Sequence, residues 1–283
     1  GKMRYNESME KKIKLILLDI DGTIVNSSWD MTPLTKQTLT RLHAAGILLG
    51  IASGRPVDDI SFHLKKWDLP FDFDVLVGLN GCEVQNNVTG AYSISHELDY
   101  QRLRTAVTLM QDHFDCIPFL YRGPLIHALK VDEVIRTSAL KSGKQPVEVD
   151  LDTLCQSPCV KVMFRTKDGQ TVAEMERFLQ DTPTPGLKWF KTQETLMEVS
   201  DPDVSKALAL PILCAQLDLP VEAIMACGDT TNDNEMLSQA GLGVCLANGT
   251  DDTKACADEI TAIDNDHDGL ARHWMEHHPE LFD

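Results

Sequence analysis

Three short apolar runs of the chain end abruptly at polar residues. They cover residues 13–20, 47–52 and 223–227, and polar motifs beginning DGT, SGR and GD follow them. Runs of this length without polar alternation are typical of strands in a parallel sheet whose two faces are both covered. We therefore expect three strands of one buried parallel sheet, although the third is remote from the others in the chain.

The segment between the first two runs predicts a helix. Residues 35–45 place Leu39 and Leu42 at helical spacing, and Gly46 follows as a C-terminal cap. A strand, a helix and a second strand are the unit of a doubly wound α/β fold. In such folds, ligands bind beyond the carboxyl ends of the strands, where the strand order reverses.

The middle of the chain, residues 83–199, follows a different pattern. Its strand-like pieces alternate apolar and polar residues, so that only one side of each piece is apolar. They lie at residues 91–95, 117–121, 125–131, 160–165, 187–190 and 195–200. Helical stretches interrupt them at residues 100–114 and 170–180. One-sided alternation favours an open sheet with helices on one face. We expect an α+β domain at 83–199, a core at 13–82 and 200–283, and a disordered tail, or residues left from expression, at 1–12.

The charge balance narrows the classes of partner. The chain has 26 basic and 43 acidic residues, a net charge of −17. Such a surface repels nucleic acid and anionic lipid, and no apolar run approaches the roughly 20 residues of a membrane span. The N-terminal residues also lack an apolar signal core. We expect a cytoplasmic protein without nucleic-acid or membrane partners, favoured as a monomer.

Acidic side chains follow two of the apolar runs. Asp19 and Asp21 stand two apart on an extended segment and so point the same way, while Asp229 and Asp233 follow the third run. An isolated Asp-x-Asp is more often a solvated turn, but carboxylates gathered from two strand ends repel each other without a cation. Their oxygen ligands predict a hard ion such as Mg²⁺. Paired carboxylates also suit the roles of nucleophile and general acid–base.

Four short motifs stand in order along the chain: Asp19-x-Asp21-Gly22-Thr23, Ser53-Gly54-Arg55, Val204-Ser205-Lys206 and Gly228-Asp229-x-x-Asn232-Asp233. Together they resemble the motifs of the haloacid dehalogenase-like hydrolase superfamily and, within it, of the Cof-type phosphatases. The resemblance covers residues 13–270. It implies a doubly wound, mostly parallel Rossmann-like core with a large cap domain inserted between the second and third motifs.

The resemblance also implies a role for each motif residue. Asp19 would attack phosphorus and become an acylphosphate, while Asp21 would protonate the leaving oxygen and then activate water. Mg²⁺ would be held by Asp19, the Asp21 backbone carbonyl and Asp229, with Asp233 orienting these ligands. Phosphoryl transfer gathers negative charge on equatorial oxygens, which need donors and cations. These phosphate-binding donors would be Ser53, Gly54, Lys206 and Asn232.

Two features depart from the family's pattern. Ala207 takes the place of the usual glycine after Lys206. Pro211 removes a backbone hydrogen bond inside the helix expected over residues 205–219. We expect a kink or a local opening of this helix, which shifts Lys206 slightly.

Two further positions each allow two explanations. Arg55 either binds phosphate or pairs with Asp58 or Asp59. The Asn80-Gly81 pair after an apolar run either contacts the substrate or only forms a turn.

Other motifs have simpler explanations. The segment Asp264-x-Asp266-x-Asp268-Gly269 begins like a calcium loop, but its twelfth position is Met275 instead of a bidentate Glu. Cys155 and Cys159 have the spacing of a metal pair but lack a second pair, and the scattered cysteines suggest core thiols. A solvated helix face explains the C-terminal histidines: His267, His273, His277 and His278.

These observations predict a Mg²⁺-dependent phosphoric monoester hydrolase for small phosphorylated metabolites, with sugar phosphates favoured. A phosphosugar mutase with the same intermediate and a catalytically silent binding protein are the alternatives. We expect substrate choice to lie in the cap domain. Its candidates to contact the substrate are Arg122, His127, Lys130, Lys161 and Arg165.

Overall fold

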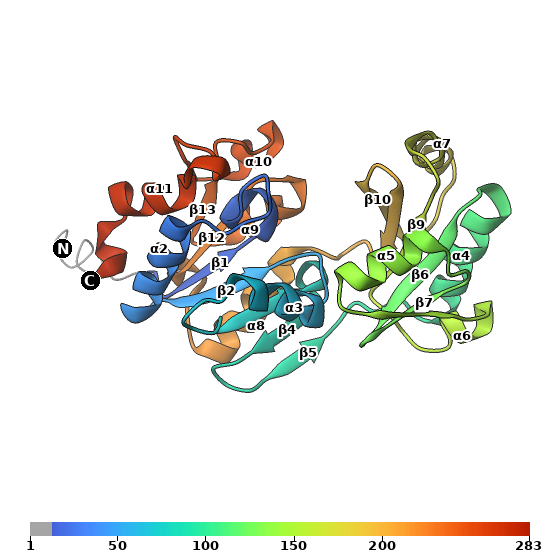
Figure 1. Ribbon diagram of the computed structural model, residues 1–283, viewed down its shortest axis with the longest axis horizontal. Coiled ribbons are helices and arrows are strands. Elements are labelled where there is room, and N and C mark those ends of the chain that lie inside the picture. Colours follow the sequence, from blue (N-terminus) through green and yellow to red (C-terminus); the bar gives the residue numbers. More distant parts are fainter. Residues whose placement is uncertain (1–12) are drawn as a thin grey trace. The chain divides into compact units, whose positions relative to one another are not determined.

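A computed structural model describes residues 13–283 as two compact units (Figure 1). The first unit runs from the start of the described chain to Ser93 and resumes at Ser205, and the second unit is Ile94–Val204. The sequence prediction placed these boundaries at 83 and 199. The tail predicted at residues 1–12 lies outside the described residues.

The first unit is built on an eight-stranded sheet. Its strands run parallel from β14 through β3, and β4 is antiparallel to β3. The strand order reverses beside β1, since β2 pairs with one edge of β1 and β12 with the other. In spatial order the strands are β14 (Glu259–Ile260), β13 (Leu242–Cys245), β12 (Ile224–Gly228), β1 (Leu15–Leu18), β2 (Leu48–Ala52), β3 (Val75–Gly78), β4 (Glu83–Asn86) and β5 (Tyr92–Ile94).

Both faces of this sheet are covered, which explains the unbroken apolar runs of the sequence. Ile16 and Leu18 belong to one hydrophobic cluster, whereas Leu15 and Leu17 belong to the cluster on the opposite face. The first cluster includes residues of α2 (Pro33–Ala44), α3 (Val57–Trp67) and α11 (Gly269–His277). The second includes residues of α8 (Ala209–Leu217) and α9 (Asn234–Gln239), with α10 (Asp251–Cys256) in contact with α9. The predicted doubly wound α/β core is confirmed.

The helix predicted at residues 35–45 is α2, which begins two residues earlier. Pro33 occupies its first turn, where no amide hydrogen bond is lost. Thr32 precedes it as the N-cap and accepts a hydrogen bond from the Thr35 amide. The helix ends before Gly46, whose φ of 91° is readily adopted only by glycine.

The second unit holds a six-stranded sheet that is antiparallel except between β7 and β8. In spatial order its strands are β10 (Lys188–Gln193), β11 (Leu196–Ser200), β9 (Lys161–Arg165), β6 (Ile117–Arg122), β7 (Leu125–Ala128) and β8 (Gln145–Glu148). One face packs against α4 (Tyr100–His113), α6 (Leu151–Cys155) and α7 (Gly169–Gln180). The helices predicted at 100–114 and 170–180 are thus confirmed as α4 and α7.

The prediction that all helices of this unit lie on one face is wrong. Helix α5 (Glu133–Lys141) packs on the other face, against Phe119, Ile126 and Met163. Only Ile135 and Ala139 of α5 are buried, so its apolar stripe is too thin to predict a helix from the sequence.

Among residues 13–283, no helix is both long enough and apolar enough to cross a membrane.

Candidate active site

The candidate site forms where β1 and β12, neighbouring parallel strands, end. Asp19 follows β1 and Asp229 follows β12, and the Asp19 amide donates to the Cys227 carbonyl at 3.0 Å. Both aspartates thus leave the sheet at the point where its strand order reverses, as expected for a ligand site. The structure brings together the two acidic motifs that are some two hundred residues apart in the chain.

Lys206 joins these carboxylates from the start of the third motif. Its side chain is fully buried, and its Nζ donates to Asp19 Oδ1 at 3.0 Å and to Asp233 Oδ1 at 2.6 Å. Residues 206–208 form a 3₁₀ turn, and α8 begins only at Ala209. Pro211 therefore lies in the first turn of α8, where a helix needs no amide donor. The expected kink within one long helix is replaced by this change of helix type.

Asp233 orients the loop that carries Asp229. Its Oδ2 accepts from the amides of Asp229 at 3.0 Å and Thr230 at 3.2 Å, while Oδ1 faces Lys206. Gly228 allows this approach, because a Cβ there would lie 2.5 Å from Asp233 Cγ. The sequence marked Asp233 as a residue that orients the metal ligands, and the structure shows the hydrogen bonds by which it holds Asp229 in place.

The turn after Asp19 packs closely against Asp229. Gly22 has φ 72°, and a Cβ there would lie 2.1 Å from Asp229 Oδ2. Thr23 Oγ1 donates to Asp229 Oδ1 at 3.1 Å. Both the left-handed backbone and the lack of space at this position require glycine.

The electrostatics of the cluster are unbalanced. Burial and the charge of Asp233 raise the pKa of Asp19 well above its ordinary value, and burial also raises the pKa of Asp229. Burial opposes the charge of Lys206, but Asp19 and Asp233 together hold its pKa above the usual range. Three carboxylates thus share one ammonium group, so the cluster carries excess negative charge when all three are ionised.

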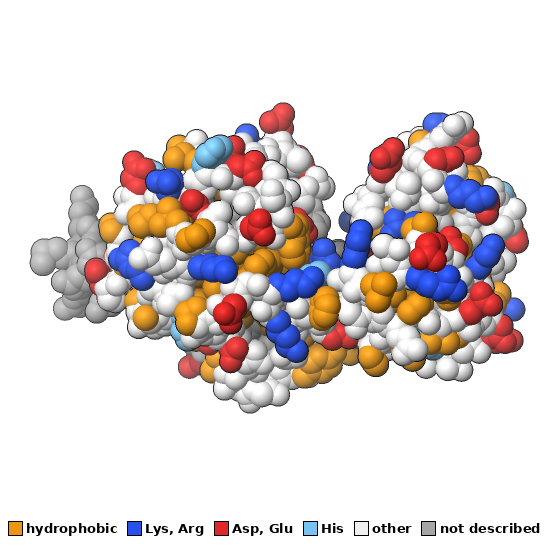
Figure 2. Space-filling model, viewed as in Figure 1, with side chains coloured by type: hydrophobic (Ala, Val, Ile, Leu, Met, Phe, Trp, Pro, Cys, Tyr) orange, Lys and Arg blue, Asp and Glu red, His pale blue; other side chains and the backbone are white. Residues whose placement is uncertain are grey.

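The donor set fits a hard divalent cation. Asp19, Asp229 and Asp233 each offer a carboxylate oxygen, and these oxygens lie within 4.8 Å of one another. All are oxygen ligands, which Mg²⁺ prefers over nitrogen or sulfur. On the face shown in Figure 2, acidic and basic side chains are interspersed over the surface. Lys206 is buried, so the positive charge of the site is local and not part of a basic surface patch.

Asp21 is held in a different way from Asp19. Its carboxylate is exposed, and Trp29 Nε1 donates a hydrogen bond to Asp21 Oδ1. Trp29 has φ 64°, which is unusual and strained for a bulky residue. Its ring lies 4.9 Å from that of His63 and 5.2 Å from that of Trp67. The sequence analysis missed Trp29, whose one signal was a large aromatic residue in an otherwise polar loop.

The second motif lies at the end of β2, and Ser53 is buried there. Its Oγ accepts from the Arg55 amide at 3.1 Å, and its carbonyl accepts from the Asn80 amide at 3.0 Å. Asn80 Oδ1 in turn accepts from Asn232 Nδ2 at 3.4 Å. The Asn80-Gly81 turn therefore connects the second and fourth motifs. A Cβ at Gly81 would lie 2.1 Å from the Ser205 carbonyl oxygen, so the turn also packs against the third motif.

Arg55 pairs with the acidic residue that follows it by one helical turn. Its Nη1 lies 3.3 Å from Asp59 Oδ2 and 3.2 Å from His63 Nε2, and its guanidinium stacks 5.4 Å from the Trp29 ring centroid. Of the two explanations left open by the sequence, the structure shows pairing with Asp59. Arg55 thereby also supports the tryptophan that contacts Asp21.

The calcium-like segment before α11 uses its carboxylates for internal hydrogen bonds. Asp266 accepts from the Ser27 amide at 2.7 Å and from its hydroxyl at 2.8 Å. Asp268 accepts from Thr35 Oγ1 at 2.9 Å and also from Thr32. These bonds tie the segment to the loop after the first motif and to the start of α2.

The prediction of a solvated C-terminal histidine face is wrong for two of the four histidines. His267 and His277 are exposed, but the side chains of His273 and His278 are only 6% and 14% exposed. Both bond to Glu259, which lies outside the helix. Because Glu259 is on another element, helical periodicity could not predict this contact.

All eight cysteines are free thiols. Burial raises the pKa of both Cys155 and Cys159 above the usual range. Neither belongs to a group of three metal-ligating side chains within residues 13–283.

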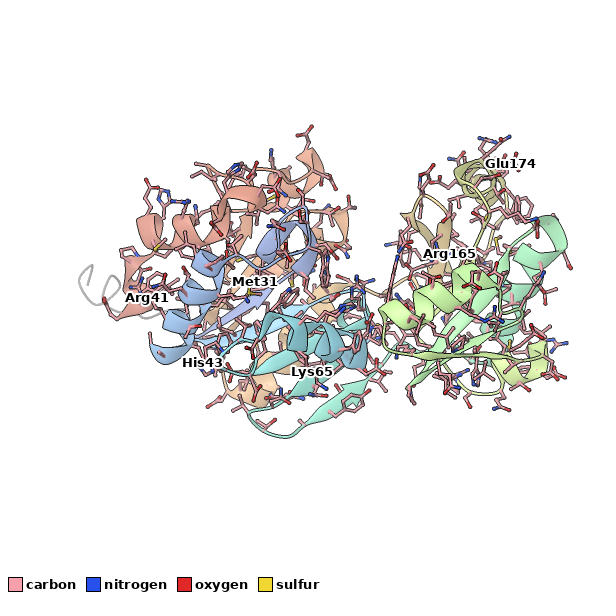
Figure 3. The ribbon with its side chains drawn as sticks, viewed as in Figure 1. Met31, Arg41, His43, Lys65, Arg165 and Glu174 are labelled. Atoms are coloured by element: carbon pink, nitrogen blue, oxygen red, sulfur yellow. The ribbon has the colours of Figure 1, made fainter. Side chains whose placement is uncertain are left out.

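The second unit has its own polar side chains on β6, β7 and β9. Lys161 pairs with Glu198 at 2.7 Å, and both are buried. Arg122 donates to three backbone carbonyls at 2.6–2.9 Å. Arg165 (Figure 3) donates to Gln193 and Thr195. Burial lowers the pKa of His127, whereas Lys130 is exposed. Arg122 and Lys161 thus have structural partners within this unit.

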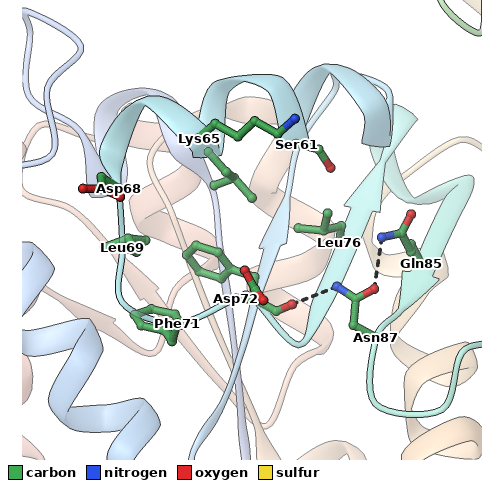
Figure 4. A pocket seen from close by; sticks show the side chains of 11 residues that line it. Ser61, Lys65, Asp68, Leu69, Phe71, Asp72, Leu76, Gln85 and Asn87 are labelled. Carbon is green, nitrogen blue, oxygen red and sulfur yellow. Dashed lines mark hydrogen bonds between the residues drawn. The ribbon is translucent and has the colours of Figure 1, made fainter.

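A separate cavity of about 560 Å³ lies in the first unit, beside the C-terminal half of α3 (Figure 4). The loop leading into β3 forms much of its wall, so it lies at the amino end of that strand. The candidate site lies at the carboxyl ends of β1 and β12. The lining includes Leu64, Lys65, Leu69, Phe71 and Asn87, and none of the lining residues belongs to the four motifs.

Comparisons with known proteins indicate the family of the chain. A family model for haloacid dehalogenase-like hydrolases matches residues 16–273. A Bacillus subtilis (strain 168) phosphatase of 5-amino-6-(5-phospho-D-ribitylamino)uracil is 28% identical, with 95% of this chain and 99% of the relative aligned. A second phosphatase of that organism, named for the same substrate, is 26% identical over 93% of this chain and 96% of its own.

Solved structures share the fold. A haloacid dehalogenase-like hydrolase from Bacteroides thetaiotaomicron matches with a TM-score of 0.80 at 27% identity, covering 94% of this chain and 99% of that one. A protein from Thermotoga maritima matches with a TM-score of 0.81 at 21% identity, covering 93% of this chain and 97% of its own. This second likeness concerns the fold alone.

Proposed function

The chain belongs to the haloacid dehalogenase-like hydrolase family and is a phosphatase, and from this premise we propose that it hydrolyses small phosphorylated metabolites with Mg²⁺ and a phosphorylated Asp19. One observation carries the proposal. Three carboxylates converge at the carboxyl ends of two adjacent strands, and within residues 13–283 Lys206 is the one ammonium group that bonds to them. Such an arrangement is stable when a divalent cation completes it.

The proposed chemistry has two steps. In the first, an Asp19 carboxylate oxygen bonds to phosphorus while the bond from phosphorus to the leaving oxygen breaks, and Asp21 gives its proton to that oxygen. In the second, Asp21 takes a proton from water, the water oxygen bonds to phosphorus, and the bond to Asp19 breaks. Mg²⁺, held by Asp19, Asp229 and the Asp21 carbonyl, would offset the negative charge of the phosphoryl group.

Each remaining motif residue has a role that its contacts support. Lys206 places an ammonium group 3.0 Å from Asp19, where it attracts phosphoryl oxygens and lowers repulsion between them and the nucleophile. Asp233 orients Lys206 and the Asp229 loop. We assign phosphoryl-oxygen binding to the Ser53 hydroxyl, the Gly54 amide and Asn232, since the Asn80 turn connects the second and fourth motifs.

The substrate class follows from chemistry and from the relatives. Two relatives are named for a substrate with a phosphorylated ribityl chain. A phosphate ester on a polyol or sugar is accordingly the class we propose first. The second unit would serve as the cap that selects the substrate. Its first candidate contacts are His127 and Lys130, since Arg165, like Arg122 and Lys161, bonds to other residues of the unit. We expect a cytoplasmic monomer without nucleic-acid or membrane partners.

The test is phosphate release from a panel of phosphorylated metabolites by the purified protein with Mg²⁺. Asp19→Asn keeps the size of the side chain but removes the nucleophile, and we expect at least about a 10⁴-fold loss of turnover. Asp218→Asn is the matched control, because Asp218 is exposed at the end of α8.

Three outcomes would count against the proposal. Release by Asp19→Asn at the rate of the unchanged protein would exclude the aspartyl-phosphate intermediate. Full activity after complete removal of divalent cations would exclude the metal. Isomerised sugar phosphate with little free phosphate would instead assign the chain to the mutases.

A further inference from the structure

A group of nitrogen and oxygen ligands meets at the edge of the first unit's sheet, outside the four motifs. Glu259 lies on β14, the edge strand, and His273 lies on α11. His278 follows the end of that helix. The Nε2 atoms of His273 and His278 lie 2.8 Å and 2.7 Å from the same atom, Glu259 Oε1.

The local chain geometry explains why these two histidines meet. Five residues along a continuous helix place side chains about 140° apart, on different faces. Here α11 stops at His277, and Pro279 prevents its continuation. His278 has φ −134° and ψ 49°, outside the helical range, so its ring turns back to Glu259. His277, one turn after His273, lies 4.0 Å from Glu276 and its side chain is 52% exposed.

Burial and charge favour a cation at this point. The side chains of His273, His278 and Glu259 are 6%, 14% and 31% exposed. The C-terminal end of α11 adds its partial negative charge.

His278 also has an acceptor for its other ring nitrogen. Its Nδ1 lies 3.4 Å from Glu280 Oε1. A metal-binding histidine usually gives the proton of its second nitrogen to such a carboxylate, which fixes the tautomer with the lone pair on the metal side. Glu280 therefore supplies the support that a metal-ligating Nε2 of His278 needs.

We propose that Glu259, His273 and His278 bind a divalent transition metal of the zinc class at the sheet edge, separately from the carboxylate cluster. Two imidazole nitrogens and one carboxylate are a ligand set for Zn²⁺, Co²⁺ or Ni²⁺, whereas Mg²⁺ prefers oxygen ligands. Three protein ligands leave one tetrahedral position for water.

The distances between ligand atoms can be compared with those of such a site, and the three atoms already lie within 4.8 Å of one another. Ligands about 2.0–2.1 Å from a tetrahedral ion stand roughly 3.3 Å apart, and the two nitrogens now lie 2.7 and 2.8 Å from the oxygen. Side chains must therefore separate by about 0.5 Å, and each imidazole must carry its proton on Nδ1. The bound ion would cross-link the C-terminal helix α11 to the edge strand β14.

The experiment uses the full chain without a histidine tag, freed of metals and then supplied with excess Mg²⁺ to satisfy the carboxylate cluster. Zn²⁺ affinity is measured by competition with a chromophoric chelator, and Co²⁺ binding by its visible absorption, which is intense for tetrahedral sites. His278→Gln removes one ligand and keeps an amide that can donate to Glu259. His277→Gln is the matched control on the same helix.

We expect one tightly bound Zn²⁺ with a tetrahedral Co²⁺ spectrum in the unchanged protein and in His277→Gln. His278→Gln should bind Zn²⁺ more than about 100-fold more weakly, because even an outer partner of a metal ligand is worth roughly 10–100-fold. Asp229→Asn should retain the site, since it alters only the carboxylate cluster. Zn²⁺ should also raise the melting temperature of the unchanged protein but not that of His278→Gln.

Three results would overturn the proposal. They are no Zn²⁺ binding beyond the carboxylate cluster, equal affinity in His278→Gln and the unchanged protein, and loss of the site in Asp229→Asn. Equal melting temperatures of the variants in metal-free buffer show that His278→Gln is folded. Each result is independent of phosphatase activity and so does not bear on the proposed function.

Discussion

Two buried groups of charged side chains in this protein are built in opposite ways. In the second unit, Lys161 and Glu198 form an ion pair at 2.7 Å. In the first unit, Lys206 lies 3.0 Å and 2.6 Å from Asp19 and Asp233, and Asp229 adds a third carboxylate. The Lys161–Glu198 pair joins one charge of each sign, whereas the cluster at Lys206 gathers three carboxylates around one ammonium group among the described residues.

The difference shows how a structural ion pair can be told from a binding site. Burying charge is costly unless it is paired, and a balanced pair roughly compensates that cost. Burial, together with the charge of neighbouring carboxylates, raises the pKa of a carboxyl group, as it does for Asp19. Proteins retain such a surplus where a cation or a reaction needs it.

Replacing Lys206 by Met should remove most of the activity. The only ammonium group in contact with Asp19 among the described residues is lost, so we expect kcat/KM to fall by about 10³-fold. Breaking two buried ion pairs should also destabilise the first unit by about 3–5 kcal/mol. Phosphate release and urea denaturation measure the two effects, with the exposed Lys14→Met as control. Near-normal activity of Lys206→Met would mean that Lys206, like Lys161, has only a structural role.

Replacing both partners of the Lys161–Glu198 pair should restore the unfolding free energy that a single replacement loses, whereas a double replacement in the carboxylate cluster should not. Lys161→Met alone leaves the Glu198 charge buried and should cost about 3 kcal/mol of unfolding free energy. Lys161→Met with Glu198→Leu should return to within about 1 kcal/mol of the unchanged protein. Lys206→Met with Asp19→Leu should not recover, because Asp233 and Asp229 remain. Denaturation curves of the single and double variants, measured beside the unchanged protein, test this. Recovery of stability in both double variants would mean that the pair and the cluster do not differ in this respect.

Trp29→Phe tests the role of the hydrogen bond that the Trp29 indole donates to the Asp21 carboxylate. Phe keeps an aromatic ring beside His63 and Trp67 at the same strained backbone position but loses the hydrogen bond to Asp21. We expect kcat/KM to fall about 10-fold for an alkyl phosphate, whose leaving oxygen needs a proton. An aryl phosphate with a good leaving group should change by less than about 3-fold. An equal loss for both substrates would mean that Trp29 only supports the fold.

The smallest effect is a pH dependence of stability in metal-free buffer. The folded-state pKa of Asp19 is raised above its unfolded value of 3.8, so the protein gains most from this group at low pH. That gain is lost as pH rises through the folded pKa. Asp19→Asn lacks this titration and should melt a few degrees higher than the unchanged protein at neutral pH, but not near pH 4. Added Mg²⁺ should narrow the gap. A gap that does not change with pH would contradict the pKa shift.

Much of the site could be predicted from the sequence because of one geometric rule. Parallel strands end at the same edge of a sheet, so any side chain directly after β1, β2 or β12 lies near the others. Asp19, Ser53 and Asp229 needed only this rule and the recognition of their strands. The apolar runs identified those strands because both faces of the sheet are buried. Helices α4 and α7 were visible as amphipathic stretches because one face of each packs in the hydrophobic cluster of the second unit.

Contacts that depend on packing were beyond this rule. Nothing in the spacing of Asp21 and Trp29 requires an indole donor to meet that carboxylate, since the loop must first adopt a positive φ beside α3. Helix α5 was missed because only two of its side chains are buried.

The fold class and the meeting of two acidic strand ends could be predicted from the residues alone, because both follow from local periodicity and sheet topology, and the four motifs were recognised by their resemblance to a family. The tertiary structure alone decided which partner each polar group takes: Lys206 between two carboxylates, Arg55 with Asp59, and two histidines on Glu259. Such choices depend on distances of a few ångströms between elements remote in the chain, and these distances are set only when the whole core packs.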